Sequence, residues 1–441
     1  MLGWRVVGGG EYTLDMPRLS AEEEGLICVA EERFREAARG GAIESEKLIT
    51  QLVSGAAAEG GIYLSRAQES YLARMAHMHI YGFWFMDELL SDPGIEEISV
   101  IGPGKPVYVY ARKGGWLRVN AVFEDERAIG ELINRMAAKL GRRITMQNPR
   151  LDAMLPDGSR LHASLPPVSA GEITIRRFRQ SPLSPAELVA NKTAGAEALA
   201  FLSVLMQCDS SVLIAGNTAS GKTSTLNALF SFVPSNERVI ITEETPEITI
   251  PHQHQMRLVA NRDMGISLKD LVYDTLRMRP DRMIVGEVRN REESEALFDV
   301  LLAGQARGCY ATFHAQSAQE ALGRLRSFGI RGEDLSSIDC IVVQRRMLSY
   351  DPKKRAGTEV RKIVEIAGVA GGDTHAIFPG QGAMKSELFR RSAESFGLSA
   401  KEMGEELGAR AGMIARAGPG FPEFFKEVQK KLYGLGGADA L

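Results

Sequence analysis

Cysteine is scarce in this chain of 441 residues. The four cysteines, Cys28, Cys208, Cys309 and Cys340, stand far apart and form no C-x-x-C pair. This spacing argues against a disulfide framework and against a structural zinc site. A reducing, cytoplasmic setting is therefore the simplest interpretation.

Long apolar runs are also missing. No run approaches the roughly 18 residues that a membrane-spanning helix needs, and the first residues lack the basic and apolar regions of a signal peptide. We therefore expect a cytoplasmic protein that does not span a membrane, although it can work beside one.

An excess of one charge is missing as well. Fifty-three basic and 56 acidic residues give a net charge of −3, so no overall positive field favours nucleic acid as a partner. A hydrophobic content of 44% with 25% charged residues is ordinary for a globular protein, and the length is sufficient for two or three domains.

One stretch carries specific chemistry, namely SVLIAGNTASGKTSTLNAL from Ser211 to Leu229. It contains the spacing G-x-x-x-x-G-K-[ST] between an apolar strand pattern and a helix pattern, as a phosphate-binding loop requires. Backbone N–H groups and the helix dipole would face one anion there, Lys222 would reach the outer phosphates, and the Thr223 hydroxyl would bind Mg²⁺. The alternative is a Gly/Ser-rich turn that matches by chance. The residues expected to bind the nucleotide are Gly216, Asn217, Thr218, Ala219, Ser220, Gly221, Lys222, Thr223 and Ser224.

Three later segments each place a polar side chain at the end of a predicted strand. Glu243 opens the acidic cluster EETPE and is the preferred general base, the alternative being a solvated loop. Glu287 follows the apolar run of RMIVGEVR and is expected to hold Mg²⁺, directly or through water, the alternative being an ion pair with Arg289. His314 ends GCYATFH and is expected to sense the outer phosphate, although a lone histidine usually has no such task.

The order of these patterns predicts an α/β fold. Strands alternate with helices after residue 194, which favours a parallel sheet covered by helices, with functional loops at the carboxyl ends of the strands. We expect five regions: a helical or mixed region over 1–80, an α+β lobe over 81–180, a linker over 181–193, a phosphate-loop domain over 194–370 and a small helical appendage over 371–441.

With four such segments in this order, the sequence resembles the secretion-system and type IV pilus assembly ATPase superfamily over roughly Tyr81 to Val369. GNTASGKT resembles its Walker A box, EETPE its Asp box, MIVGEVR its Walker B box and GCYATFHA its His box. RPDRMIVGEVRNREES is similar to the archaeal versions. The sequence departs from the family pattern at Glu244, where an aspartate is usual, and at Gln305-Ala306-Arg307, where a histidine commonly begins the His box.

The resemblance implies a fold and a partner set. It implies a RecA-like motor domain behind a PAS-like N-terminal lobe, with ATP and Mg²⁺ as cofactors and with Arg160 and Arg176 reaching the phosphates. It also implies a homo-hexameric ring that pushes on an integral membrane platform protein of a pilus or a type II or type IV secretion machine, at the inner face of the membrane. The tetracysteine zinc module of the export branch is absent from the sequence.

Two other functions stay open at this point. RecA-like rings also translocate nucleic acid, although neither the net charge nor an aromatic and basic track favours this here. A protein of another class would bind ATP without hydrolysis and act as a scaffold switch. Glu243, Glu287 and His314 favour turnover over that switch.

Overall fold

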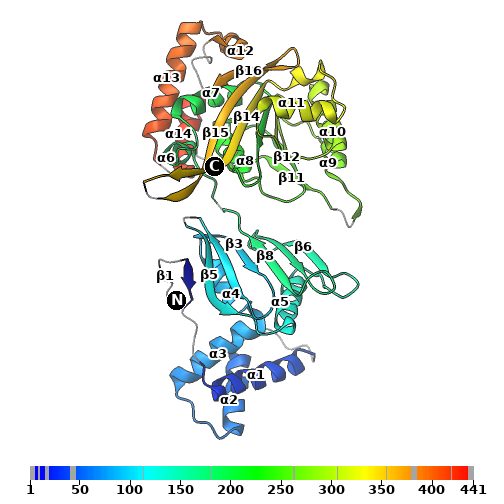
Figure 1. The fold of residues 1–441 in the computed structure, drawn as a ribbon, viewed down its shortest axis with the longest axis vertical. Helices are drawn as coiled ribbons and strands as arrows, with labels where there is room; N and C mark the ends of the chain where they lie inside the picture. Colours follow the sequence, from blue (N-terminus) through cyan, green and yellow to red (C-terminus); the bar gives the residue numbers. More distant parts are fainter. Residues whose placement is uncertain are drawn as a thin grey trace. The chain divides into compact units, whose positions relative to one another are not determined.

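The structure is a computed structural model that describes residues 5–7, 10–14, 19–39, 46–112, 114–179, 181–261, 264–304, 306–353, 355–378, 385–418 and 420–435. The chain forms two compact units, Met1–Arg179 and Gln180–Leu441, shown in Figure 1. Within the described ranges, no helix is both long enough and apolar enough to cross a bilayer.

The first unit begins with three helices that share a small core. They are α1 (Ala21–Arg39), α2 (Glu46–Glu59) and α3 (Arg66–Tyr81). Ile27, Val53 and Leu72 are buried between them. Helix α3 starts where Ser65 and Gln68 form a capping box, because each side chain satisfies a backbone N–H group of the first turn.

An eight-stranded sheet completes the first unit, in the order β1-β2-β5-β4-β3-β8-β7-β6. Burial alternates along β5, where Leu117, Val119 and Ala121 face the core and their neighbours are exposed. Helix α5 packs Ile129 and Ile133 against the same core. The elements are β1 (Arg5–Val7), β2 (Glu11–Thr13), α4 (Phe85–Ser91), β3 (Ile95–Val100), β4 (Pro106–Ala111), β5 (Gly115–Val122), α5 (Glu126–Lys139), β6 (Arg150–Met154), β7 (Arg160–Ser164) and β8 (Glu172–Arg176).

The second unit is built on another eight-stranded sheet, in the order β11-β10-β12-β13-β9-β14-β15-β16. The strands from β11 to β14 in this order are parallel, β15 pairs antiparallel with β14, and β16 pairs antiparallel with β15. The α/β prediction is thereby confirmed. The strands are β9 (Val212–Gly216), β10 (Val239–Glu243), β11 (Gln255–Val259), β12 (Arg282–Val288), β13 (Gly308–Phe313), β14 (Cys340–Asp351), β15 (Ala356–Ala370) and β16 (Asp373–Phe378).

Helices cover both faces of this sheet (Figure 1). One face packs against α6 (Pro185–Ala190), α7 (Ala196–Gln207), α8 (Lys222–Leu229), α12 (Glu387–Phe396), α13 (Ala400–Arg416) and α14 (Phe421–Tyr433). The other face packs against α9 (Leu268–Asp274), α10 (Arg291–Ala303) and α11 (Ala318–Ser327). Strands β9, β10, β12 and β13 are buried on both faces, which explains their largely apolar sequences, whereas the edge strand β11 is mostly exposed.

Two expected boundaries differ from the structure. The segment 181–193, expected as a linker, contains α6, which Ser184 and Glu187 cap and which buries Leu188. The segment 371–441, expected as an appendage, contributes β16 to the sheet and buries Phe389 and Phe424 in the same core as α7. Local composition suggested loose segments, but their apolar side chains complete the core of the second unit.

Gln429 fixes the last helix to this unit. Its side chain is fully buried, donates to the carbonyls of Ser231 and Val233 at 3.2 and 3.0 Å and accepts from the N–H of Ser235 at 2.8 Å. We expect Gln429→Ala to lower the free energy of unfolding by about 1–3 kcal/mol, because these backbone groups would lose their partners. Urea unfolding measures the loss. Lys426→Ala, on the exposed side of the same helix, is the control, and equal effects of the two changes would contradict this role.

Candidate active site

The glycine-rich loop lies between β9 and α8, as the sequence predicts. A Cβ atom on Gly216 would come within 2.1 Å of the Gln344 carbonyl oxygen and 2.6 Å of the Ser220 hydroxyl, so no larger residue fits. Gly221 has φ of +94° and forms the N-cap of α8. These two glycines turn the chain tightly from the end of β9 into the start of the helix.

Lys222 folds back over this loop. Its side chain is 8% exposed, and its ammonium donates to the carbonyls of Gly216 and Asn217 at 3.3 and 3.4 Å. Burial lowers the pKa of Lys222, while the carboxylates of Glu287 and Glu247 act in the opposite direction. The buried Ser220 hydroxyl has no hydrogen-bond partner among the described residues. A buried ammonium and a hydroxyl without a partner at a helix start suit an anion.

The other loop residues divide into two groups. Thr218 and Ala219 are exposed, and Ala219 has φ of +58°, which is uncommon for a residue with a side chain. Asn217 is predicted to contact the nucleotide, but in the structure its side chain binds the backbone of Arg346. Its amide donates to the Arg346 carbonyl at 3.0 Å and accepts from the Arg346 N–H at 2.9 Å, and so it extends the sheet ladder from the loop to β14.

Glu287 is the centre of the charged cluster. One carboxylate oxygen lies 2.8 Å from Nε2 of His314 and 4.0 Å from the ammonium of Lys222, and the other accepts from Nε of Arg289 at 2.6 Å. Burial acts to raise the pKa of Glu287, but the hydrogen bond from His314 and the charge of Arg289 prevail and lower it to about 2. Glu287 is therefore ionised throughout the neutral range.

Of the two interpretations of Glu287 that the sequence left open, the structure contains the ion pair, whereas the Mg²⁺ role stays a prediction. The ion pair with Arg289 exists, and Arg289 also binds the Glu244 carboxylate. The contacts to Lys222 and His314 exist as well. A register shift between Val285 and Val288 marks an irregularity in β12 at this position. Such irregularities re-aim side chains beside functional sites.

Glu243, the predicted general base, is almost fully buried beneath the turn that follows β10. One of its carboxylate oxygens accepts from the N–H groups of Glu247 and Ile248, both at 2.8 Å, and the other lies 3.3 Å from Nε of Arg257. Burial raises the pKa of Glu243 to about 7, although these N–H groups and Arg257 act in the opposite direction. In this structure Glu243 shapes the turn that carries Glu247.

Glu247 is a site residue that the sequence did not single out. Its carboxylate accepts from the Thr223 hydroxyl at 3.4 Å. Asn227 of α8 holds the same segment, since its amide donates to the Glu247 carbonyl at 3.5 Å and accepts from the Thr249 N–H at 3.1 Å. Membership in the cluster EETPE was the available signal, but the spacing alone did not show which carboxylate the turn directs toward α8.

Arg160 and Arg176 lie in the first unit. They are directly opposite each other on the neighbouring strands β7 and β8, and Nε of Arg176 lies 3.4 Å from the Glu97 carboxylate. The structure thus brings the two predicted arginines together with each other. Gln305, noted where a histidine is usual, lies outside the described residues.

A family model described as "Type II/IV secretion system protein" matches residues 87–385, more than half of the chain. The chain belongs to this family.

Relatives of this secretion-system family occur in archaea and bacteria. An uncharacterized protein of Methanocaldococcus jannaschii is 32% identical over 335 residues, which are 73% of this chain and 60% of the relative, so this chain spans only part of that protein's length. A putative conjugal transfer protein of Mycobacterium tuberculosis is 31% identical over 310 residues, 67% of this chain and 86% of the relative. The crystal structure of the Legionella pneumophila ATPase DotB aligns with a TM-score of 0.49 and 18% identity, over 81% of this chain and 94% of DotB.

The described residues contain no group of three or more His, Cys, Asp or Glu side chains that could hold a metal. The Thr223 hydroxyl and the Glu247 carboxylate nevertheless offer oxygen donors at the start of α8. That donor set fits Mg²⁺, which usually takes one or two protein ligands together with phosphate oxygens and water.

The raised pKa of Glu243 predicts a pH dependence of stability. A carboxyl group that is protonated more readily when folded contributes stability at low pH, and this contribution is lost as the pH rises through about 7. We expect the free energy of unfolding of the wild type, measured with urea, to fall between about pH 5 and about pH 8. This fall should exceed that of Glu243→Gln by up to about 3 kcal/mol. Identical pH dependences would contradict the raised pKa.

Proposed function

We propose that this member of the secretion-system family is an ATPase with a RecA-like motor unit and a phosphate-binding P-loop at residues 216–224. The observation that carries the proposal is the meeting of Lys222, Glu287 and His314 at the carboxyl edge of one parallel sheet. A buried cation at a helix start, next to the ionised carboxylate of Glu287, suits phosphoryl transfer, in which catalysis is mostly positioning and charge stabilisation.

The loop residues bind the phosphates in this proposal. Lys222 neutralises the outer phosphates and exchanges its carbonyl partners for phosphate oxygens, while Ser220 and the N–H groups at the start of α8 donate to the anion. Mg²⁺ would be held by Thr223, water and phosphate oxygens, and it would neutralise the developing charge. Glu287, which lies beside Lys222 and His314, would hold this Mg²⁺ directly or through water.

In this proposal, the attacking water is activated by residues of the turn after β10. Glu247 is the residue that we assign to orient the attacking water, because its carboxylate faces Thr223 at the start of α8. Glu243 supports it through the two N–H groups that it binds, and its pKa of about 7 allows proton exchange near neutral pH. His314 senses the outer phosphate through its contact with Glu287.

The first unit contributes Arg160 and Arg176 as phosphate contacts. Their side-by-side placement on β7 and β8 supports a shared anion, since like charges directly opposite each other are otherwise unfavourable. We propose that both arginines contact the phosphates of the bound nucleotide, as the family resemblance implies.

The cellular role follows from the family. We propose a homo-hexameric ring that powers assembly of a type IV pilus-like filament or of a type II or type IV secretion machine. It would lie at the inner face of the cytoplasmic membrane and act on an integral membrane platform protein. The relative named as a putative conjugal transfer protein is consistent with a transport role.

Two alternatives remain distinguishable by simple assays. A nucleic-acid translocase would hydrolyse ATP faster when DNA is added, whereas the proposed motor would not respond. A scaffold switch would bind ATP and release no phosphate. The cluster of Glu247, Glu287 and His314 near Lys222 favours hydrolysis over the switch.

Lys222→Ala tests phosphate binding. Loss of the buried ammonium removes the charge that faces the outer phosphates, so we expect ATP affinity to fall at least about tenfold and phosphate release to stop. Equilibrium binding of ATP and a phosphate-release assay measure the two effects. Hydrolysis near the wild-type rate in this variant would remove the loop from the active site.

Glu247→Gln separates binding from turnover. The amide keeps the shape of the side chain but cannot accept a proton, so we expect ATP to remain bound while hydrolysis slows by about 10²–10⁴-fold. Glu295→Gln, which alters an exposed ion pair with Arg291 on α10, is the matched control and should leave the rate unchanged. If Glu247→Gln hydrolyses at the wild-type rate, water activation belongs to another residue.

A further inference from the structure

A hairpin made by the ends of β14 and β15 projects from the sheet of the second unit. Strand β14 pairs with β9 only as far as Gln344, and β15 pairs with β16 only from Ile366 onward. In the part of the chain that the structure describes, residues 345–351 and 356–362 therefore pair only with each other. At about 3.4 Å per residue, this hairpin extends roughly 20 Å past the end of β9.

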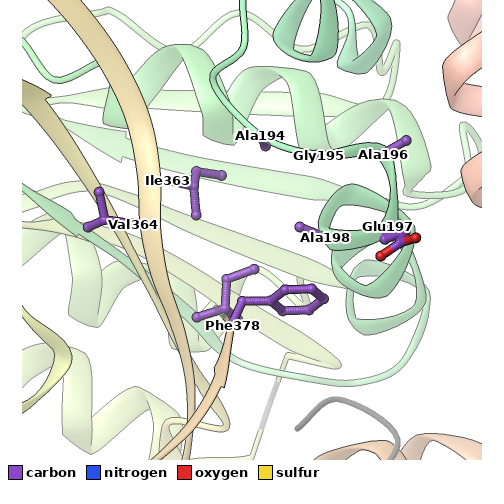
Figure 2. A pocket seen from close by; sticks show the side chains of 9 residues that line it. Ala194, Gly195, Ala196, Glu197, Ala198, Ile363, Val364 and Phe378 are labelled. Carbon is purple, nitrogen blue, oxygen red and sulfur yellow. The ribbon is translucent and has the colours of Figure 1, made fainter. Parts of the chain in front are cut away.

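The base of the hairpin is fixed on both strands. The side chain of Asn217 in the glycine-rich loop binds the N–H and the carbonyl of Arg346 at 2.9 and 3.0 Å. On the other strand, the N–H of Ile363 donates to the Thr193 carbonyl at 2.8 Å, and Figure 2 shows Ile363 beside the start of α7. The projecting part is thus held in place before a partner binds, which lowers the entropic cost of binding.

Positive charge is concentrated in this hairpin. Residues 345–362 contain seven Lys and Arg residues and two acidic residues, a net charge of +5 in a chain whose total is −3. Glu359 pairs with two of the arginines near the base. Lys353 and Arg355 at the turn, and Lys362 on β15, are exposed, and their side chains form no ion pair within the described ranges. Most of the charge is therefore open to a partner.

Two large apolar side chains accompany these cations. Leu348 is 74% exposed and Tyr350 is 60% exposed. They are two residues apart on one strand and so lie on the same face of the hairpin. The residue opposite Tyr350 is Gly357, which has no side chain to cover the ring. A single exposed apolar residue is common, but these two, next to cations without partners, form an amphipathic surface.

An anionic lipid surface suits this combination. Clusters of roughly four to eight Lys and Arg residues bind the negatively charged headgroups of a membrane. A tyrosine favours the boundary between headgroups and acyl chains, and an apolar side chain such as leucine is buried just below it. A nucleic acid would match the charge but offers no apolar phase to a leucine side chain.

We propose that the β14–β15 hairpin binds the anionic headgroups of a membrane surface, with the cations of its turn at the phosphates and with Leu348 and Tyr350 in the interface. The inference goes beyond the proposed ATPase activity, because it gives the chain a direct contact with lipid. Asn217 joins the base of the hairpin to the glycine-rich loop, so this contact lies next to the proposed nucleotide site.

Flotation of the full chain with lipid vesicles, without nucleotide, tests the proposal. We expect binding to vesicles of equal parts phosphatidylglycerol and phosphatidylcholine to be at least about tenfold tighter than to pure phosphatidylcholine, and to weaken in concentrated salt. Lys353→Glu combined with Arg355→Glu should weaken binding to the anionic vesicles at least about tenfold. Leu348→Ser combined with Tyr350→Ser should weaken it by a similar factor, through loss of apolar contact.

Arg390→Glu combined with Lys401→Glu is the matched control. It changes the net charge by the same amount as the charge reversal in the hairpin, at exposed positions of α12 and α13. We expect this variant to bind the anionic vesicles like the wild type. A loss as large as that of the hairpin variants would contradict a specific role of the hairpin.

The other outcomes also decide the proposal. Equal binding to both kinds of vesicle, binding to neither, or unchanged binding of either hairpin variant would overturn it. Binding of a DNA duplex, or self-association, that the hairpin variants lose while no vesicle is bound would overturn it in favour of nucleic acid or of a second copy of the chain. Because no nucleotide takes part, these results leave the proposed ATPase activity to its own tests.

Discussion

The carboxylate of Glu287 is the point on which the arrangement of the site depends. It is shared by His314 from the end of β13, by Arg289 and, at 4.0 Å, by Lys222 from the start of α8. Three segments of the chain thus converge on one partly buried anion. Their convergence requires β12 and β13 to be parallel neighbours and β9 to lie beside β13, because only then do the three segments end at the same edge.

The charge balance of this cluster determines the charge states of Glu287 and Lys222. Glu287 stays ionised because cations surround it, and the buried Lys222 relies on this negative charge since its carbonyl partners only partly replace water. The carboxylate therefore keeps the ammonium charged and in place near the loop. A polyphosphate can then take over the interaction without first having to order the lysine side chain.

The sequence predicted the parts of the site that depend on local pattern. The spacing of Gly216, Gly221 and Lys222 located the loop, and the apolar runs before Glu287 and His314 located strand ends at one edge. The pairing of Asn217 with the Arg346 backbone was not predictable, because it joins positions 129 residues apart. The choice between Glu243 and Glu247 depends on the direction of a turn, which composition does not determine.

The fold, like the site, is predictable from the sequence only where the pattern is local. Alternating strands and helices indicated the parallel sheet, since that pattern is repeated along the chain. The segment 371–441 was expected to stand apart because it is rich in glycine and alanine. Its role in the core follows from the few large side chains that it carries, such as Phe389 and Phe424, which belong to the same core as α7 and the strands. Such long-range packing leaves no periodic signal in the sequence.

The facing arginines of β7 and β8 have a consequence for the first unit taken alone. Arg160 and Arg176 are neighbours across the ladder, and the nearby Glu97 can offset only part of their mutual repulsion. The ends of these two inner strands thus carry a repulsion between like charges that dissolved salt relieves by screening. An isolated first unit would accordingly tolerate heat better in concentrated buffer than in dilute buffer, and a multivalent anion would protect it at far lower concentration than chloride.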